Sequence, residues 1–401
     1  MVDAVSLADI EAARPPVEAV ANRTPVVPSA ALTTRFDRAV SLKAENLQRT
    51  GSFKIRGAMN KVASLGDLAA PGVTAGSAGN HAQALAFAAL HFGVPCDIFV
   101  PAGAPITKIE ACLSYGATVT EGGDSLSEAV ASARSLAQAD GKVFCHPFDD
   151  PIVVAGQGTL GLELVEDIDD MAMVIVPLGG GGLAAGTAIA VKSTHPDVRV
   201  VGVQAAACAP YAHGETPLGA VTTLADGIAV KQPGTVTRPL VDQWLDDIVT
   251  VDENAIADAM VMLMDRAKLY VEGAGAVGVA ALLAGVVDPA ERGTTCVVLS
   301  GGNVDLGVVP NLIRRHETSA ERRLVVFARI DDRPGGLVRF LSAFATAGAN
   351  LVEVQHQREG VRLGVRQTGV HATFEVRGAD HAAAVVAGAR DQGFTDLVVE
   401  S

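Results

Sequence analysis

The chain has 401 residues, enough for two or three domains with separate cores. Hydrophobic residues make up 49% of it and charged residues 19%, which argues against a disordered chain and is typical of a Gly-rich α/β protein. The net charge of −14, without a long run of lysine and arginine, argues against nucleic acid as a partner.

The N-terminal residues Met1 to Ala4 do not form a basic region followed by an apolar core. No uninterrupted apolar run reaches the ~20 residues that a membrane span needs. We therefore expect a cytoplasmic protein with no membrane partner. The odd number of cysteines and the lack of a C-x-x-C pair predict reduced, mostly buried thiols, with a redox or metal role as the alternative, at Cys96, Cys112, Cys145, Cys208 and Cys296.

The first predicted elements lead toward one lysine. A helix is expected over residues 7–21, an extended segment over 24–28, and a strand over 40–44. The polar segment from Glu45 to Gly57 then places Lys54 between a glycine-containing turn and an apolar helical pattern. An amine held at such a junction can do chemistry, although most lysines are solvated surface residues.

Short apolar runs then alternate with helical patterns in two series. In the first, strands at 73–75, 97–100 and 118–120 alternate with helices at 81–92, 107–115 and 126–139. The second has strands at 173–178, 198–204, 248–250 and 296–299, with helices at 184–192 and 254–269. This alternation predicts βαβ units, and hence two α/β lobes with parallel sheets and a cleft between them.

Two loops between a strand and a helix have the composition of anion sites. In the first, small residues let backbone N–H groups face a carboxylate at a helix N-terminus, although an ordinary turn capped by Asn80 explains the loop equally well; its residues are Ser77, Ala78, Gly79, Asn80 and His81. In the second, four glycines before Leu183 can wrap N–H groups around a phosphate, with a flexible surface turn as the alternative; they are Gly179, Gly180, Gly181 and Gly182.

Two G-x-G-x-x-G matches, at 156–161 and 273–278, test a dinucleotide-binding interpretation. Neither has a convincing ribose-binding acid about 20 residues further on, and the second follows a helical pattern instead of a clear strand. A G-x-x-x-x-G-K-[ST] phosphate loop is absent from the sequence. Nucleotide binding is therefore not expected.

The composition changes near residues 311–323, which are polar and charged. We expect a catalytic domain at 1–312, a linker at 313–322 and a small domain at 323–401. In the small domain, strands at 324–330, 350–357, 370–376 and 397–399 and helices at 337–347 and 379–392 form a βαββαβ order.

The segment Ser52-Phe53-Lys54-Ile55-Arg56-Gly57 resembles the lysine segment of the fold-type II pyridoxal-phosphate (PLP) enzymes, in the form typical of threonine and serine dehydratases. The resemblance implies a two-lobed, tryptophan synthase β-like α/β catalytic domain. The turn Arg333-Pro334-Gly335-Gly336-Leu337 makes the small domain resemble an ACT domain, an amino-acid-sensing module with a ferredoxin-like fold.

The resemblance also implies residue roles. Lys54 would be the Schiff-base lysine and catalytic base, with Phe53 against the cofactor ring and Asn80 at the ring oxygen. Gly179 to Gly182 and Leu183 would hold the phosphate, and Ser300 would meet the pyridine nitrogen. The loop from Ser77 to His81 would bind the substrate carboxylate, Gly156 to Thr159 would lie at the cleft, and Glu272 to Gly275 would lie along its wall.

We therefore expect a PLP-dependent threonine dehydratase that converts L-threonine, and also L-serine, to the 2-oxo acid and ammonia. Isoleucine biosynthesis, a homotetramer and control by isoleucine or valine are implied, with effector residues Gly335, Gly336, Leu337 and Asn350. Serine dehydratase and serine racemase are alternatives, but a racemase is expected to have a serine where Ala78 stands. The segment from Gln204 to Pro210 lacks the carboxylates of the metal-binding racemases, so no metal is expected. A non-catalytic amino-acid sensor is the third alternative.

Overall fold

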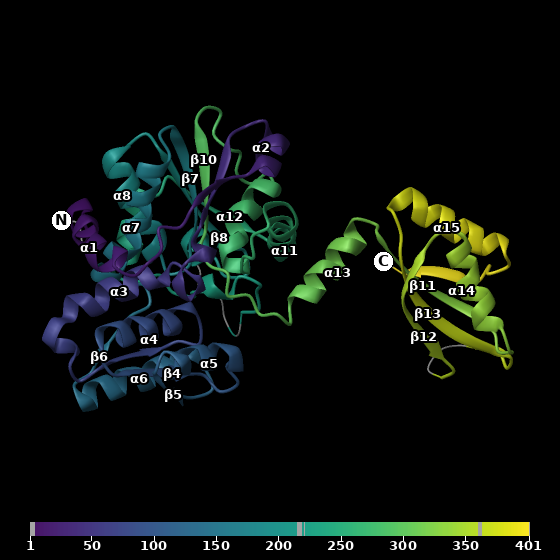
Figure 1. Ribbon diagram of the computed structural model, residues 1–401, viewed down its shortest axis with the longest axis horizontal. Coiled ribbons are helices and arrows are strands. Elements are labelled where there is room, and N and C mark those ends of the chain that lie inside the picture. Colours follow the sequence, from purple (N-terminus) through teal and green to yellow (C-terminus); the bar gives the residue numbers. More distant parts are fainter. Residues whose placement is uncertain (1–4, 215–218, 220, 360–362, 401) are drawn as a thin grey trace. The chain divides into compact units, whose positions relative to one another are not determined.

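The structure is a computed structural model that describes residues 5–214, 219, 221–359 and 363–400 (Figure 1). Residues 1–4, on which the expectation of no leader peptide rests, lie outside the described residues. The chain separates into two compact units, Met1–Asp305 and Leu306–Ser401. The division precedes the predicted boundary at residue 312 because helix α13 (Val309–Ser319) belongs to the second unit and contacts its first strand.

The larger sheet of the first unit has the strand order β1-β2-β10-β7-β8-β9. Only β1 runs antiparallel to its neighbour; the other pairs are parallel. All residues of β2 are buried, as expected for a parallel strand covered on both faces. The strands are β1 (Val26–Pro28), β2 (Val40–Ala44), β7 (Met171–Pro177), β8 (Arg199–Ala205), β9 (Asp247–Val251) and β10 (Thr294–Leu299).

Helices pack around this sheet. The described helices are α1 (Leu7–Glu18), α2 (Ala30–Phe36), α7 (Pro151–Asp167), α8 (Gly182–Thr194), α9 (Pro210–His213), α10 (Thr237–Trp244), α11 (Glu253–Met262), which continues as a π-helix over Leu263–Ala267, and α12 (Gly273–Leu283). Helix α12 packs on β7, β8 and β10, and α7 packs along α8.

The smaller sheet is parallel, with the order β5-β4-β3-β6, and it forms the second lobe (Figure 1). Its elements are β3 (Val73–Gly76), α4 (Asn80–Phe92), β4 (Cys96–Val100), α5 (Ile106–Ser114), β5 (Thr118–Glu121), α6 (Leu126–Asp140) and β6 (Val143–Phe144). The predicted pair of α/β lobes is therefore confirmed.

Helix α3 (Lys54–Leu65) packs against both α4 and α7. Arg56, in the first turn of α3, has a side chain that is only 1% exposed. Its guanidinium nitrogens lie 2.8 Å from a carboxylate oxygen of Glu45 and 2.7 Å from one of Glu163, and both acids are buried. Lys43 adds a second buried cation, 2.6 Å from Glu163. This network fixes the part of the chain that carries Lys54.

The first G-x-G-x-x-G motif, expected at the cleft, is buried. It lies inside the buried helix α7, where a Cβ at Gly158 would come within 2.9 Å of the Gly186 carbonyl oxygen. A Cβ at Gly186 would come within 2.5 Å of the Val154 carbonyl oxygen. These glycines therefore allow α7 and α8 to pack closely.

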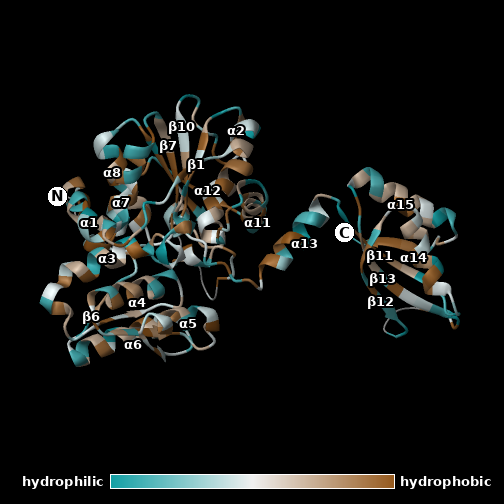
Figure 2. Cartoon of the chain, in the orientation of Figure 1, coloured by the Kyte–Doolittle hydropathy of each residue, from teal (hydrophilic) through white to brown (hydrophobic). Residues whose placement is uncertain are grey.

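The second unit follows the predicted βαββαβ order after α13. Its sheet is antiparallel, with the order β12-β13-β11-β14, and Figure 2 shows hydrophobic residues along β11. Aromatic residues Phe340, Phe344 and Phe374 form the centre of its core. The elements are β11 (Arg323–Asp331), α14 (Gly336–Thr346), β12 (Asn350–Gln357), β13 (Gln367–Glu375), α15 (Ala379–Asp391) and β14 (Leu397–Glu400). Most of the predicted linker at 313–322 is helical, within α13.

All five cysteines are buried with free thiols, as predicted, and burial raises the pKa of Cys145 to about 12. Within the part of the chain that the structure describes, no helix has the length and apolar character needed to cross a membrane.

Candidate active site

Lys54 is the first residue of α3, and a left-handed turn at Thr50 and Gly51 lies shortly before it. Its Nζ donates a 2.9 Å hydrogen bond to the Pro147 carbonyl oxygen and lies 5.1 Å from the centre of the Phe53 ring. The Phe53 N–H donates to the carbonyl oxygen of Ser300 over 3.1 Å. The lysine segment is thereby tied to the end of β10.

The environment of Lys54 favours its neutral amine. Burial lowers the pKa of Lys54 to about 8, and the negative charge of Glu272 opposes this effect. About a tenth of the amine is therefore unprotonated at pH 7, far more than for an exposed lysine. The unprotonated amine is the form that acts as a nucleophile or a base.

Three amide and carboxylate side chains form a chain of hydrogen bonds near Lys54. Asn80, the first residue of α4, donates from Nδ2 to Glu272 Oε1 over 2.8 Å. Its Oδ1 accepts from Asn303 Nδ2 at 2.7 Å, and Asn303 also donates to the Thr50 carbonyl oxygen at 2.8 Å. Asn80 therefore connects the small lobe to residues on the larger one.

Glu272 is a buried carboxylate whose chemistry the sequence reasoning missed, because only its segment was expected along a wall. Burial raises the pKa of Glu272 to about 7, and the charge of Asp226 adds to this effect, while the Asn80 hydrogen bond opposes it. A Cβ at Gly301 would lie 2.4 Å from Glu272 Oε1, so any larger residue there would displace the carboxylate. The available signal was an acid directly before the glycine-containing start of a helix at Gly273.

The glycine loop connects β7 to α8 and is enclosed by other elements. A Cβ at Gly179 would lie 2.8 Å from the Ile228 Cα, and one at Gly180 would lie 2.2 Å from the Phe148 ring. Gly181 has φ of +95°, a left-handed value that favours glycine. The loop thus brings backbone without side chains to the N-terminus of α8, where partial positive charge favours an anion.

Leu183 follows the loop inside α8, and its side chain belongs to the core of the larger lobe. Only its backbone N–H is available to a ligand at the helix N-terminus. Ser300 is 2% exposed at the end of β10, beside the lysine segment.

The predicted carboxylate loop lies between β3 and α4 and is partly exposed from Ser77 to Asn80. Ser77 Oγ accepts the Gly79 N–H at 3.3 Å, so part of its bonding capacity is used within the loop. His81 is buried, and its Nε2 lies 3.0 Å from the Cys145 carbonyl oxygen. Burial and the charge of Lys54 lower the pKa of His81 to about 3, so its ring is neutral near pH 7.

The predicted effector residues of the second unit do not form one cluster. Gly335 and Gly336 lie at the N-terminal end of α14, with Leu337 in its first turn, whereas Asn350 follows the other end of this helix of 11 residues, about 16 Å away. Asn350 Nδ2 donates to Glu375 Oε2 at 2.9 Å.

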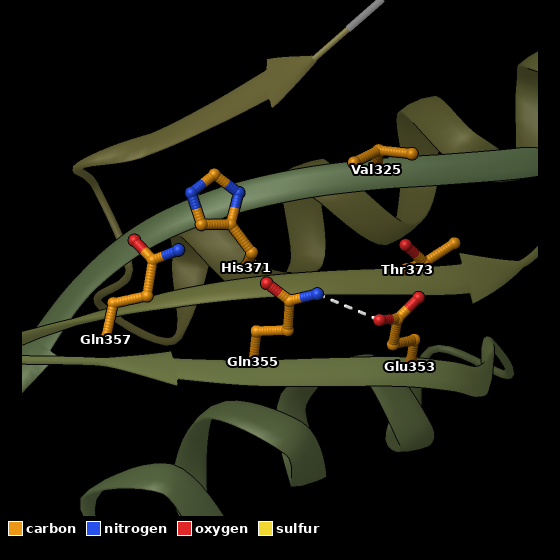
Figure 3. Close-up of a pocket in the computed structure, with 6 residues that line it drawn as sticks. All are labelled: Val325, Glu353, Gln355, Gln357, His371 and Thr373. Carbon is orange, nitrogen blue, oxygen red and sulfur yellow. Dashed lines mark hydrogen bonds between the residues drawn. The ribbon is translucent and has the colours of Figure 1, made fainter.

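A separate polar hollow of about 220 Å³ lies on the sheet of the second unit (Figure 3). It is on the face away from the core, because His371 and Thr373 alternate with the core residues of β13. None of the predicted effector residues lines it; the lining residues are Val325, Glu353, Gln355, Gln357, His371 and Thr373.

The chain is similar to known proteins over most of its length. A family model described as pyridoxal-phosphate dependent enzyme matches residues 17–301. The chain is 43% identical over 379 residues to the L-threonine ammonia-lyase of Geobacter sulfurreducens, covering 93% of this chain and 94% of that protein. The solved threonine deaminase of T.th. is 38% identical, with a TM-score of 0.71, and covers 75% of this chain and 99% of its own. The solved structure of maize serine racemase is 32% identical, with a TM-score of 0.73, and the match covers 79% of this chain and 99% of the racemase chain.

Proposed function

This chain belongs to the family of pyridoxal-phosphate-dependent enzymes, and we propose that it deaminates L-threonine to 2-oxobutanoate and ammonia by β-elimination of water. The observation that carries the proposal is the joint placement of Lys54 and the glycine loop. The Lys54 amine bonds the Pro147 carbonyl oxygen, and the next residue, Phe148, packs on Gly180.

The site fits pyridoxal phosphate. The loop from Gly179 to Gly182 is a cradle in which side chains would collide with neighbouring elements, so backbone N–H groups at the start of α8 remain for the phosphate. Lys54 supplies the amine that captures the cofactor's aldehyde. When bound, the cofactor withdraws electrons from the bonds at the substrate's α-carbon.

Residues of this chain carry out the proton transfer at the substrate. Lys54 Nζ removes the α-proton of threonine, and its pKa of about 8 suits a base that works near neutral pH. The β-hydroxyl leaves as water, and the resulting enamine hydrolyses to 2-oxobutanoate and ammonia. The N-terminus of α4 and the loop before it supply N–H groups for the substrate carboxylate.

Asn80 holds its amide between Glu272 and Asn303, which sets the direction in which its remaining N–H points. That N–H is proposed to meet the cofactor ring oxygen. Ser300, a neutral hydroxyl group, is proposed to meet the ring nitrogen and to leave it unprotonated. Elimination of a β-hydroxyl tolerates this weaker electron sink, because the electrons depart with the leaving group.

Serine racemisation is the second candidate, because maize serine racemase shares the fold at 32% identity. Two features weigh against it. Ala78 offers no side-chain base, and the segment from Gln204 to Pro210 contains no carboxylate. Gln204 Oε1 instead accepts the N–H groups of Tyr211 and Ala212 at 3.0 and 3.1 Å. Dehydration is therefore preferred.

The βαββαβ unit supports a regulatory role as an ACT domain, with isoleucine as inhibitor and valine as antagonist in a biosynthetic homotetramer. Because Gly335 and Asn350 lie at opposite ends of α14, one effector could contact both only if two copies of the unit contribute. Isoleucine should lower the rate in the wild type, and Asn350→Ala should reduce that response. Light scattering measures the oligomer.

The deciding experiment measures 2-oxo acid release from L-threonine and L-serine, with Lys54→Ala and, as a matched control on the same helix, Lys61→Ala. We expect a higher kcat/KM for threonine, no activity in Lys54→Ala, and retained activity in Lys61→Ala. A wild-type protein that binds pyridoxal phosphate but releases no 2-oxo acid from either substrate contradicts the proposal. D-serine formation would then be measured.

A further inference from the structure

Five consecutive residues between β6 and α7, Cys145 to Asp149, contact the candidate site at several points. The Cys145 carbonyl oxygen lies 3.0 Å from His81 Nε2, and the Pro147 carbonyl oxygen accepts from Lys54. His146 Nδ1 accepts the N–H groups of Phe148 and Asp149 at 3.3 and 2.8 Å, which holds the segment in a turn. The proposed function uses only the Pro147 contact and the Phe148 packing.

Asp149 caps helix α10. Its Oδ1 accepts the N–H groups of Val236 and Thr237 at 2.8 and 3.1 Å, and its Oδ2 accepts the N–H and hydroxyl of Thr235 at 2.9 and 3.0 Å. Burial opposes ionisation, but these donors outweigh it and hold the pKa of Asp149 below its usual range. The carboxylate therefore fixes where α10 begins.

Helix α10 in turn holds the glycine loop. The Thr237 hydroxyl, fully buried, donates to the Gly180 carbonyl oxygen at 2.7 Å, and the Tyr211 hydroxyl adds a 3.2 Å bond to the same oxygen. In a trans peptide the C=O and the next N–H point in opposite directions. Fixing the Gly180 carbonyl toward Thr237 therefore directs the Gly181 N–H away from α10.

We propose that Asp149 is a positioning residue for the cofactor phosphate. Through Thr237 it sets the Gly180–Gly181 peptide, while two residues earlier Pro147 holds the Lys54 amine. The segment from Pro147 to Asp149 thereby sets the spacing between the two groups that must hold opposite ends of one cofactor. This inference rests on the proposed cofactor role of the glycine loop and goes beyond it by naming what orients that loop.

Asp150 provides a matched control. It is the adjacent carboxylate, and it also caps a helix, because its Oδ1 accepts the Ile152 N–H at 2.9 Å at the start of α7. It pairs with Lys61 at 2.7 Å and, among the residues that the structure describes, makes no hydrogen bond to α10 or the glycine loop. Its loss removes a cap of the same kind without changing the phosphate cradle.

The test compares Asp149→Asn with Asp150→Asn in the full chain, and uses two probes, pyridoxal phosphate and pyridoxal, which lacks the phosphate. Dissociation constants are read from the absorbance of the bound cofactor. We expect Asp149→Asn to weaken pyridoxal phosphate binding about tenfold or more, which corresponds to about 1.4 kcal/mol, and to leave pyridoxal binding unchanged. Asp150→Asn should change neither by more than about threefold.

Thr237→Val and Thr237→Ser keep the inference testable should Asp149→Asn fold poorly. The valine variant lacks the hydroxyl and should reproduce the selective loss, whereas the serine variant keeps it and should restore binding. When pyridoxal phosphate is saturating, we expect the kcat of Thr237→Val to return toward the wild-type value, with the KM for threonine unchanged.

Equal losses for both probes, or equal effects of Asp149→Asn and Asp150→Asn, would overturn the inference and leave Asp149 a structural cap. These binding ratios do not depend on which substrate is turned over. A wild type that binds the cofactor but makes no 2-oxobutanoate therefore contradicts the proposed activity without affecting this test.

Discussion

The Asn80 amide donates a 2.8 Å hydrogen bond to the Glu272 carboxylate and so joins the first turn of α4 to the residue preceding α12. The acid at this junction has a pKa raised to about 7, mainly by burial. The relationship links residues 192 positions apart in the sequence. The raised pKa of the buried Glu272 makes the apoprotein's stability depend on pH in a defined direction.

Glu272→Gln should stabilise the apoprotein more at pH 8 than at pH 4.5. Between the ordinary pKa of 4.5 and the folded value of about 7, the folded state binds more protons than the unfolded state, so this group lowers stability as pH rises. The rise in the pKa of Glu272 on folding corresponds to a loss of stability of roughly 3 kcal/mol at high pH. A glutamine carries no charge and so does not cause this loss. Thermal midpoints at the two pH values measure the difference.

Glu166 supplies a control of opposite sign. Hydrogen bonds from Arg14 and Arg23 hold the pKa of Glu166 below its usual range. Its contribution is present above the ordinary pKa and is lost as pH falls, so Glu166→Gln should destabilise slightly at pH 8. A Glu272→Gln effect that is the same at both pH values would contradict the assignment of a raised pKa.

The rate at which the apoprotein captures pyridoxal phosphate should rise with pH and level off above about 8. The neutral Lys54 amine is the nucleophile, and its fraction falls about tenfold for each pH unit below the pKa. Stopped-flow absorbance measures the capture rate. A profile that continues to rise toward pH 10.5 would indicate that burial does not lower the pKa of Lys54.

Arg56→Met should lower the free energy of unfolding by about 3–5 kcal/mol, because it leaves the carboxylates of Glu45 and Glu163 buried without their arginine partner, with the Lys43 ammonium still beside Glu163. Arg199→Met is the matched control, since the Arg199 and Asp247 side chains are both nearly half exposed and an exposed pair contributes at most about 1 kcal/mol. Urea denaturation of both variants measures the difference. Similar losses would show that the buried network is not a special anchor for α3.

Gly180→Ala should reduce retention of the cofactor more than Gly182→Ala. The new methyl group would lie 2.2 Å from the Phe148 ring at Gly180, but 3.2 Å from the nearest atom, the Phe148 carbonyl oxygen, at Gly182. Displacing Phe148 would also disturb the neighbouring Pro147 contact to Lys54. Cofactor absorbance after gel filtration, with far-UV circular dichroism as the folding control, gives the comparison. Full retention in Gly180→Ala would rule out the close packing.

The sequence by itself determined many of the alternating strands and helices and, for a few of them, the residues that begin them. The boundaries predicted for β2 and β12 match the structure, and Lys54 lies at the start of a helix as its turn and apolar pattern predicted. These features depend on neighbouring residues and on periodicity, which a sequence displays directly. Helix α7 was not among the predicted elements, because its glycines, which the structure uses for close packing on α8, obscure the helical pattern.

Only the tertiary structure decided which distant segments meet. It brought β2 beside β10, Asn80 to Glu272, and Asp149 to the helix that holds Gly180. Parallel strands and buried polar pairs are selected by burial and hydrogen bonding between segments that no local pattern connects. The reacting groups could therefore be predicted from the sequence. The residues that orient them could be identified only from the folded structure.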